Sequence, residues 1–319
     1  MMRLDRAIRF HERCLVSPSL VQRDAYSDFG YSAKQQDKHK QGRGKVVLIT
    51  GCSVGGIGYA LAEEFASRGA TVYATARRLD AMDGLSELGV RLLPLDVTCI
   101  ESVKESIARV MSECDCIDVL VNNAGFGAPS PVAEIPLDRL RLVYETNVFG
   151  AVALSQAVFP HMAKHGSGTI INMSSVSSYT HRPFTSAYSG SKAALNAVTN
   201  CMRVEMKPFG IRVVLVTPGY IRTNIFSKTA ADMLSIPDNS PYKALELRMC
   251  QSYKYRAADT KNPPASQLAE RIVNAAFAKQ PPIRVVFGRH AYAGVLFGSL
   301  PSCLQDWVST RLYGKGHNL

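Results

Sequence analysis

The 319-residue sequence contains no uninterrupted apolar run of about 18 residues, the length that a membrane-spanning helix requires. Its first 16 residues also lack the apolar core of a signal peptide, and Asp5 and Glu12 argue against an acid-poor transit peptide. We therefore predict neither a transmembrane helix nor a signal peptide. We expect a cytoplasmic protein, or one peripheral to the endoplasmic reticulum or lipid droplets.

Paired cysteine motifs are missing as well. The eight cysteines are scattered, and only Cys114 and Cys116 lie close together, with no second Cys or His pair to complete a zinc site. We expect free thiols, a reducing compartment and no metal site.

A basic stripe interleaved with aromatic residues is also absent, although the formal charge is +11. Residues 1–44 hold nine Lys and Arg against five Asp and Glu, and the rest of the excess is spread thinly. This pattern argues against nucleic-acid binding. An anionic cofactor, an anionic substrate or a lipid surface would account for the charge equally well.

From residue 45 onward, short runs rich in Val, Ile and Leu alternate with longer helical stretches, as in strands that helices cover on both faces. The predicted strands are 45–50, 71–76, 90–95, 117–122, 168–173, 211–217 and 283–288. The predicted helices are near 58–68, 101–113, 138–164, 186–206 and 265–279. This alternation predicts an α/β, doubly wound Rossmann fold, with a single parallel sheet of about seven strands and helices on both faces.

Breaks in this rhythm divide the chain. Residues 1–44 are polar and aperiodic, which predicts a flexible N-terminal extension before a Rossmann-fold domain over 45–290. Residues 224–264 interrupt the alternation after the sixth strand, where a long insertion would cover a ligand. Residues 291–319 form an apolar C-terminal extension, which could pack on the core, line a substrate tunnel or lie on a lipid surface.

A glycine-rich loop, "TGCSVGGIG" at 50–58, follows the first predicted strand and opens a helix. Gly51 would allow the tight turn, and Gly56 and Gly58 would let the backbone approach a pyrophosphate at the helix N-terminus. The Rossmann spacing G-x-G-x-x-G is not met, so the loop alone is a weak indication. Either Gly55 or Gly56 could face the pyrophosphate.

The end of the second strand indicates which dinucleotide would bind. Acidic residues at this position favour NAD, whereas arginines accommodate the 2′-phosphate of NADP. The strand ends "ATARR", with Arg77 and Arg78 following Ala76. A guanidinium pair suits a phosphate, so NADPH/NADP⁺ is the predicted cofactor.

Tyr188 and Lys192 lie four residues apart in "YSGSK", which places them on one face of a helix. A nearby ammonium would stabilise the tyrosine phenolate and bring its pKa toward the working range of an acid–base catalyst. Thirteen residues upstream of Tyr188, Ser175 ends a predicted strand and would donate a hydrogen bond to a substrate carbonyl. Ser174 is the neighbouring alternative.

These motifs, taken together, carry a family resemblance. The glycine loop, Asp96 in "PLDVT", "NNAG" (122–125), Asn147 in "TNVFG", Ser175, "YSGSK" and "TPGYIRT" (217–223) occur in the order found in short-chain dehydrogenases/reductases. The resemblance covers roughly residues 45–225 and continues more weakly to about 288. The usual family loop is G-x-x-x-G-x-G, and here one more residue separates Gly51 from Gly56, which we interpret as a subfamily mark.

The resemblance implies site roles. The implied catalytic residues are Asn147, Ser175, Tyr188 and Lys192, with Tyr188 as proton donor or acceptor. Lys192 would also hold the nicotinamide ribose, and Asn147 would support the water chain behind it. The implied cofactor-binding residues are Gly51, Ser53, Gly56, Ile57, Gly58, Arg77, Asp96, Asn123, Tyr188, Lys192 and Thr223. Within this set, Asp96 would contact the adenine, Asn123 would lie beside the adenosine ribose, and Thr223 would hold the carboxamide. Asn147 and Asn123 could also serve the packing of their own elements.

The stretches 46–79 and 203–214 resemble the NADPH-dependent 1-acyldihydroxyacetone-phosphate reductases of fungi and plants within this family. The resemblance implies reduction of a lipid-like carbonyl compound. The alternative is a dehydrogenase/reductase of a steroid, a retinoid or a polyketide-type alcohol or ketone. A catalytically silent NADP-binding regulator is disfavoured, because all four catalytic positions are filled. The family often forms homodimers or homotetramers, and the C-terminal segment could contact a membrane or lipid droplet.

Overall fold

The computed structural model describes residues 44–180, 182–225, 227, 229 and 236–313. Apart from Gly44, the predicted N-terminal extension lies outside these residues. Part of the predicted insertion, including 230–235, also lies outside them.

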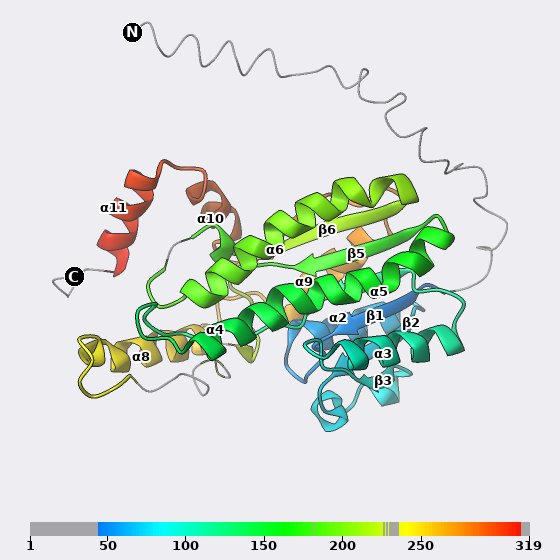
Figure 1. The fold of residues 1–319 in the computed structure, drawn as a ribbon, viewed down its shortest axis with the longest axis horizontal. Helices are drawn as coiled ribbons and strands as arrows, with labels where there is room; N and C mark the ends of the chain where they lie inside the picture. Colours follow the sequence, from blue (N-terminus) through cyan, green and yellow to red (C-terminus); the bar gives the residue numbers. More distant parts are fainter. Residues whose placement is uncertain (1–43, 181, 226, 228, 230–235, 314–319) are drawn as a thin grey trace, which may run out of the picture. The chain divides into compact units, whose positions relative to one another are not determined.

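Seven parallel strands form one sheet in the order β3-β2-β1-β4-β5-β6-β7 (Figure 1). Their bounds are β1 Val46–Thr50, β2 Thr71–Ala76, β3 Arg91–Pro94, β4 Val119–Asn122, β5 Gly168–Met173, β6 Ile211–Pro218 and β7 Arg284–Phe287. Each predicted strand forms within two residues of its expected bounds. The predicted parallel, doubly wound sheet is therefore confirmed.

Helices cover both faces of the sheet because strand side chains alternate between them. In β1, Val47 and Ile49 join the core formed with α2 (Ile57–Ser67) and α9 (Ala265–Phe277), whereas Val46 and Leu48 face the opposite core. That opposite core is completed by α3, α5 and α6, with bounds Ile100–Glu113, Gly150–Lys164 and Ser186–Glu205. All four of these β1 side chains are fully or almost fully buried, so β1 lies at the centre of the fold.

The single helix predicted over 138–164 is divided. It consists of α4 (Leu137–Tyr144), a π-helical turn (Glu145–Phe149) and α5. A π turn adds one residue to the helical repeat and is frequent at functional sites. Here it presents Asn147, which is buried.

The stretch Leu137–Lys164 is also long and apolar enough, by length and composition, to cross a membrane. Its mean hydropathy in the most apolar window is 1.2, and 44% of that window is buried within the protein. In α5, Leu154, Val158 and Met162 are fully buried in the core beneath the sheet. We therefore interpret it as a core helix.

The two regions that break the strand–helix rhythm contain helices of their own. The region after β6 includes α8 (Glu246–Ala258), and the C-terminal extension forms α10 (Ala291–Phe297) and α11 (Ser302–Tyr313) (Figure 1). A Cβ atom on Gly294 of α10 would lie only 2.1 Å from Cγ2 of Val176, so α10 packs closely against the turn that follows β5.

Candidate active site

Most of the predicted site residues follow the carboxyl ends of the strands. Because all seven strands are parallel, these ends meet at one edge of the sheet. The residues placed there, one after each of β1 to β6, are Gly51, Arg77, Asp96, Asn123, Ser175 and Thr223. The order of strands reverses between β1 and β4, and a crevice for a ligand is expected at such a point.

The glycine loop ends at an uncapped helix. Gly56 is the N-cap residue of α2, Ile57 begins the helix, and no side chain caps its N-terminus. The Gly56 amide donates to the Ser53 carbonyl at 3.0 Å, which closes the turn before the helix. The first-turn N–H groups of a helix attract anions, so this end suits a pyrophosphate.

Three glycines of the loop are required by its geometry, and the first is Gly51, which has φ +73° and leaves only 2.9 Å between a Cβ there and the Ala124 Cα. Gly55 has φ +73°, and a Cβ there would meet the Asn224 side chain at 2.1 Å. Gly58 is buried, and a Cβ there would lie 2.5 Å from both Asn123 Nδ2 and the Gly51 carbonyl oxygen. Gly55 therefore forms the turn, and Gly56 is the glycine at the N-terminus of α2.

Two asparagines hold this loop in place. Asn123 Nδ2 donates to the carbonyl oxygens of Thr50 and Gly51 at 2.9 and 3.1 Å, so its amide ties the loop to β4. Asn224 donates from its backbone to the Gly55 carbonyl at 3.1 Å and from Nδ2 to the Val54 carbonyl at 3.3 Å. The segment after β6 is thus attached to the loop after β1.

The two arginines after β2 differ in their partners. Arg78 forms an ion pair with Asp80 at 2.5 Å, with a second hydrogen bond at 3.0 Å. Arg77 is exposed, and among the described residues it forms no ion pair or side-chain hydrogen bond. Of the two, Arg77 has its guanidinium available for a phosphate.

Asp96 and Thr223 lie at the same edge, after β3 and β6. Asp96 is half-buried and accepts two hydrogen bonds from Thr98 through Oδ1, at 2.9 and 2.7 Å. Thr223 is half-buried as well, and its Oγ1 accepts from the Ile225 amide at 3.4 Å.

Asn147 joins the π turn to two neighbouring segments. Its Oδ1 accepts from the Phe126 amide at 3.0 Å, and its Nδ2 donates to the Phe126 carbonyl at 3.0 Å and to Ser191 Oγ at 2.9 Å. Ser191 Oγ in turn donates to the backbone carbonyl of Tyr188 at 2.8 Å. Asn147 therefore fixes the part of α6 that carries Tyr188 and Lys192.

Lys192 is buried, and its Nζ donates to the Met173 carbonyl at 2.8 Å. Burial lowers the pKa of its ammonium to about 8. Nζ also lies 5.8 Å from the centre of the Tyr188 ring. A cation at this distance favours the phenolate form of the tyrosine, which is what an acid–base role requires.

The two candidate serines have different surroundings. Ser174 Oγ donates to Asn196 Oδ1 at 2.5 Å, so its hydroxyl hydrogen is used within the core. Ser175 Oγ accepts from the Ser177 amide at 3.1 Å, and its own O–H has no acceptor among the described residues. Ser175 lines the pocket described next and Ser174 does not, so the geometry favours Ser175.

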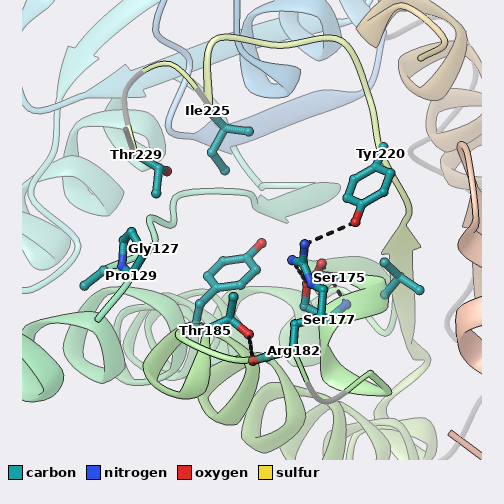
Figure 2. A pocket seen from close by; sticks show the side chains of 12 residues that line it. Gly127, Pro129, Ser175, Ser177, Arg182, Thr185, Tyr220, Ile225 and Thr229 are labelled. Atoms are coloured by element: carbon teal, nitrogen blue, oxygen red, sulfur yellow. Dashed lines mark hydrogen bonds between the residues drawn. The ribbon is translucent and has the colours of Figure 1, made fainter. Parts of the chain in front are cut away.

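Both Ser175 and Tyr188 line a pocket of about 560 Å³ of empty space, including its solvent-open part. Figure 2 shows the side chains that line this pocket. Ile225 and Thr229, from the region after β6, line one side. The other lining residues are Gly127, Ala128, Pro129, Val176, Ser177, Arg182, Thr185 and Tyr220. Among the described residues, Asn147 and Lys192 support this pocket from the core without lining it.

A comparison with protein families agrees with this arrangement. The family model described as short chain dehydrogenase matches residues 45–234. The chain belongs to the short-chain dehydrogenase/reductase family. The predicted family is therefore confirmed.

Relatives and solved structures extend the family assignment over most of the chain. An NADPH-dependent 1-acyldihydroxyacetone phosphate reductase of Schizosaccharomyces pombe is 40% identical over 209 residues, 64% of this chain and 70% of the relative. A short-chain dehydrogenase/reductase of Pestalotiopsis microspora is 34% identical over 275 residues, 85% of this chain and 94% of the relative. The crystal structure of a short-chain dehydrogenase from Streptomyces avermitilis has a TM-score of 0.70 at 31% identity, covering 86% of this chain and 99% of that one.

The sequence did not single out several polar residues of the site, among them Asn224, Ser191 and Arg182. Asn224 directly follows Thr223, and Ser191 lies in the YSGSK motif directly before Lys192. Their positions next to predicted site residues are a signal that could have identified both. Arg182 lies in the irregular segment between β5 and α6, where no periodic pattern indicates the direction of a side chain.

Proposed function

We propose that this oxidoreductase uses NADPH to reduce the carbonyl of a lipid-like substrate, with Tyr188 as the proton donor. One observation carries the proposal: the hydroxyls of Ser175 and Tyr188 line one pocket, and the buried ammonium of Lys192 lies 5.8 Å from the Tyr188 ring. Two hydroxyl donors near a cation can stabilise an oxygen atom that gains negative charge during the reaction.

The residues at the carboxyl edge of the sheet fit a dinucleotide. The uncapped N-terminus of α2 would receive the pyrophosphate through Gly56, Ile57 and Gly58, and Arg77 would bind the 2′-phosphate. Asp96 Oδ2 has no hydrogen-bond partner among the described residues and would accept from the adenine. The Schizosaccharomyces pombe relative is named an NADPH-dependent reductase, which supports the same cofactor.

Four side chains would perform the reaction. Bound NADPH supplies the hydride that adds to the carbonyl carbon. Ser175 donates its O–H to the carbonyl oxygen, and Tyr188 transfers its phenolic proton to that oxygen, which yields an alcohol. Lys192 stabilises the resulting phenolate until solvent returns the proton, and Asn147 keeps α6 in place. The reverse sequence oxidises an alcohol.

The substrate class rests on resemblance and on the pocket. The name of the Schizosaccharomyces pombe relative favours a ketone such as 1-acyldihydroxyacetone phosphate. Val176, Ile225 and Pro129 give the pocket apolar surface for an acyl chain. A steroid, retinoid or polyketide-type ketone is the alternative, and an NADPH-oxidation screen across these classes would decide between them.

The C-terminal helices bear on the predicted partners. Four large apolar side chains of α10 and α11 are exposed, namely Tyr292, Leu296, Leu304 and Trp307. They support the predicted contact with a lipid surface and the location at a membrane or lipid droplet. A homodimer or homotetramer stays a prediction.

Substitution of Tyr188 by Phe tests the proposed acid. We expect turnover to fall by at least about 10²–10⁴-fold, the usual contribution of a general acid, because the ring remains and only the proton is lost. NADPH affinity, measured by fluorescence titration, should fall by less than about tenfold, because the substitution removes one hydroxyl and keeps the ring. Tyr292→Phe, on the exposed face of α10, is the matched control. Retention of more than a few per cent of wild-type activity in Tyr188→Phe would contradict the role.

A further inference from the structure

Arg182 is the one charged side chain among the described residues that line the pocket. Figure 2 shows its guanidinium directed toward Ser177 and Tyr220, beside Ser175. Nη2 donates to Ser177 Oγ at 3.2 Å, and Nη1 donates to Tyr220 Oη at 3.1 Å. Both acceptors are neutral hydroxyls, so the bonds hold the group in place without balancing its charge.

The other arginines of the fold with charged partners provide a contrast. Each of them reaches a carboxylate, as in Arg68–Glu64, Arg78–Asp80 and Arg289–Asp259. Within the described ranges, no Asp or Glu lies within ion-pair distance of Arg182, although the side chain is half-buried. A half-buried guanidinium with no counter-charge gains most when an anion binds beside it.

The segment that carries Arg182 is held firmly. Thr185 Oγ1 donates to the Arg182 carbonyl at 2.9 Å, and the Ser130 amide donates to the Phe184 carbonyl at 3.1 Å. Phe184 has φ +65°, a conformation that few non-glycine residues adopt, and its ring meets Tyr242 edge-on with centroids 6.3 Å apart. Surrounding contacts therefore fix the position of the guanidinium before any ligand arrives.

The guanidinium is also close to the reacting centre. Ser177 Oγ accepts from Arg182, and the Ser177 amide donates to Ser175 Oγ at 3.1 Å. Only one residue thus separates the guanidinium from the hydroxyl that would bind the substrate carbonyl. A group bound by Arg182 would lie within a few bonds of that carbonyl on the same molecule.

We propose that Arg182 binds an oxyanion of the substrate, a phosphate ester or a carboxylate near the ketone, and so selects anionic ketones. A guanidinium has five N–H donors, and two of them are used by Ser177 and Tyr220, which leaves donors for a two-point contact. The inference rests on the proposed function, because it assigns the substrate of that same pocket.

Matched ketones with and without charge test this role. One pair is 1-acyldihydroxyacetone phosphate and its phosphate-free counterpart, and the other is a 3-oxo fatty acid and its methyl ester. For Arg182→Gln, kcat/KM should fall roughly 100-fold on the anionic member of one pair, mainly through KM, and less than about threefold on its neutral member. Arg182→Lys should restore only part of the loss, because it keeps the charge but cannot make the two-point contact. If kcat/KM falls selectively for the acyldihydroxyacetone phosphate pair, the oxyanion is a phosphate; if it falls selectively for the fatty acid pair, the oxyanion is a carboxylate.

A purely structural role would give a different result. If Arg182 only positioned Ser177 and Tyr220, Arg182→Gln would lower kcat/KM equally for charged and neutral ketones, and that outcome overturns the proposal. Arg284→Gln is the matched control, because Arg284 stacks on the Tyr179 ring at 5.5 Å and does not line the pocket. It should leave both kinds of ketone unaffected.

A binding measurement separates this inference from the proposed function. If wild type oxidises NADPH with none of the ketones, the proposed function fails, and calorimetry still tests the anion site. Glycerol 3-phosphate is titrated into protein saturated with NADP⁺, so that the 2′-phosphate already occupies Arg77. Its Kd should rise at least tenfold in Arg182→Gln, with glycerol as the neutral control. Equal binding by wild type and variant contradicts the inference.

Discussion

The cofactor edge and the catalytic cluster of this protein satisfy their polar groups in opposite ways. At the cofactor edge, defined by the uncapped end of α2, Arg77 and Asp96, donors and acceptors remain without partners in the described chain. In the catalytic cluster, defined by Asn147, Ser191 and Lys192, each of the three buried side chains bonds to its neighbours.

This contrast indicates two kinds of preorganisation. The cofactor edge offers free groups to a ligand, so its substitutions should change binding and leave the fold unaffected. The catalytic cluster is bound into the core, so its substitutions should change stability and turnover together. Three substitutions, taken from the largest expected effect to the smallest, test whether this division holds.

Asn147→Ala should have the largest effect. It removes three hydrogen bonds in a buried site, so we expect the free energy of unfolding to fall by about 2 kcal/mol and kcat by roughly 100-fold. Urea unfolding and steady-state kinetics measure the two quantities. Asn122→Ala is the control, because Asn122 is a buried amide bonded to Ser155 and Asn172. It should lose similar stability with little change in kcat, and parallel losses of kcat in both variants would break the comparison.

Lys192 should give the catalytic cluster a pH signature. The pKa of Lys192 is about 8 in the folded protein and 10.5 as a free side chain. Below pH 8 the side chain is therefore protonated in both the folded and the unfolded protein, and burial of its charge destabilises the fold in full. As pH rises from 8 toward 10.5, the folded protein releases the proton first and is stabilised. Relative to Lys192→Met, wild type should gain about 2 kcal/mol in unfolding free energy between roughly pH 7.5 and 10. A difference that stays flat across this range would contradict the buried ammonium.

Arg77→Ala should have the smallest effect and sharpen the contrast. Losing the 2′-phosphate contact should raise KM for NADPH about tenfold and leave KM for NADH within about threefold, with no measurable change in unfolding free energy. Arg78→Ala is the control, because Asp80 already binds Arg78. Equal effects on the two cofactors would refute the contact, and a loss of stability would remove the distinction between the two regions.

Much of the fold could be predicted because its causes are local. Runs of Val, Ile and Leu specify strands such as β1 and β5, and the parallel alternation with helices specifies the sheet. The π turn at Glu145–Phe149 could not be predicted, since its extra residue is accommodated by contacts of Asn147 with Phe126 and Ser191 from distant segments.

The site could be predicted only where motifs fix it. Ser175 and Ser174 are equivalent in sequence, and the difference between them comes from Asn196, a partner 22 residues beyond Ser174. Similarly, the tandem Arg77 and Arg78 are distinguished by Asp80, and Gly55 and Gly56 by the presence of Asn224. In each case, tertiary contacts decide between neighbours that a motif treats alike.

The attachment of Asn224 to the glycine loop has a practical meaning for anyone who recombines members of this family. Asn224 bonds to the loop through Val54 and Gly55, and Ile225, the next residue, lines the pocket. A chimera that is joined directly at the end of β6 would therefore replace Asn224 together with the pocket-lining residues. It would lose the hydrogen bonds that hold the glycine loop as well as changing the pocket. The natural splice point for changing specificity alone lies after Asn224.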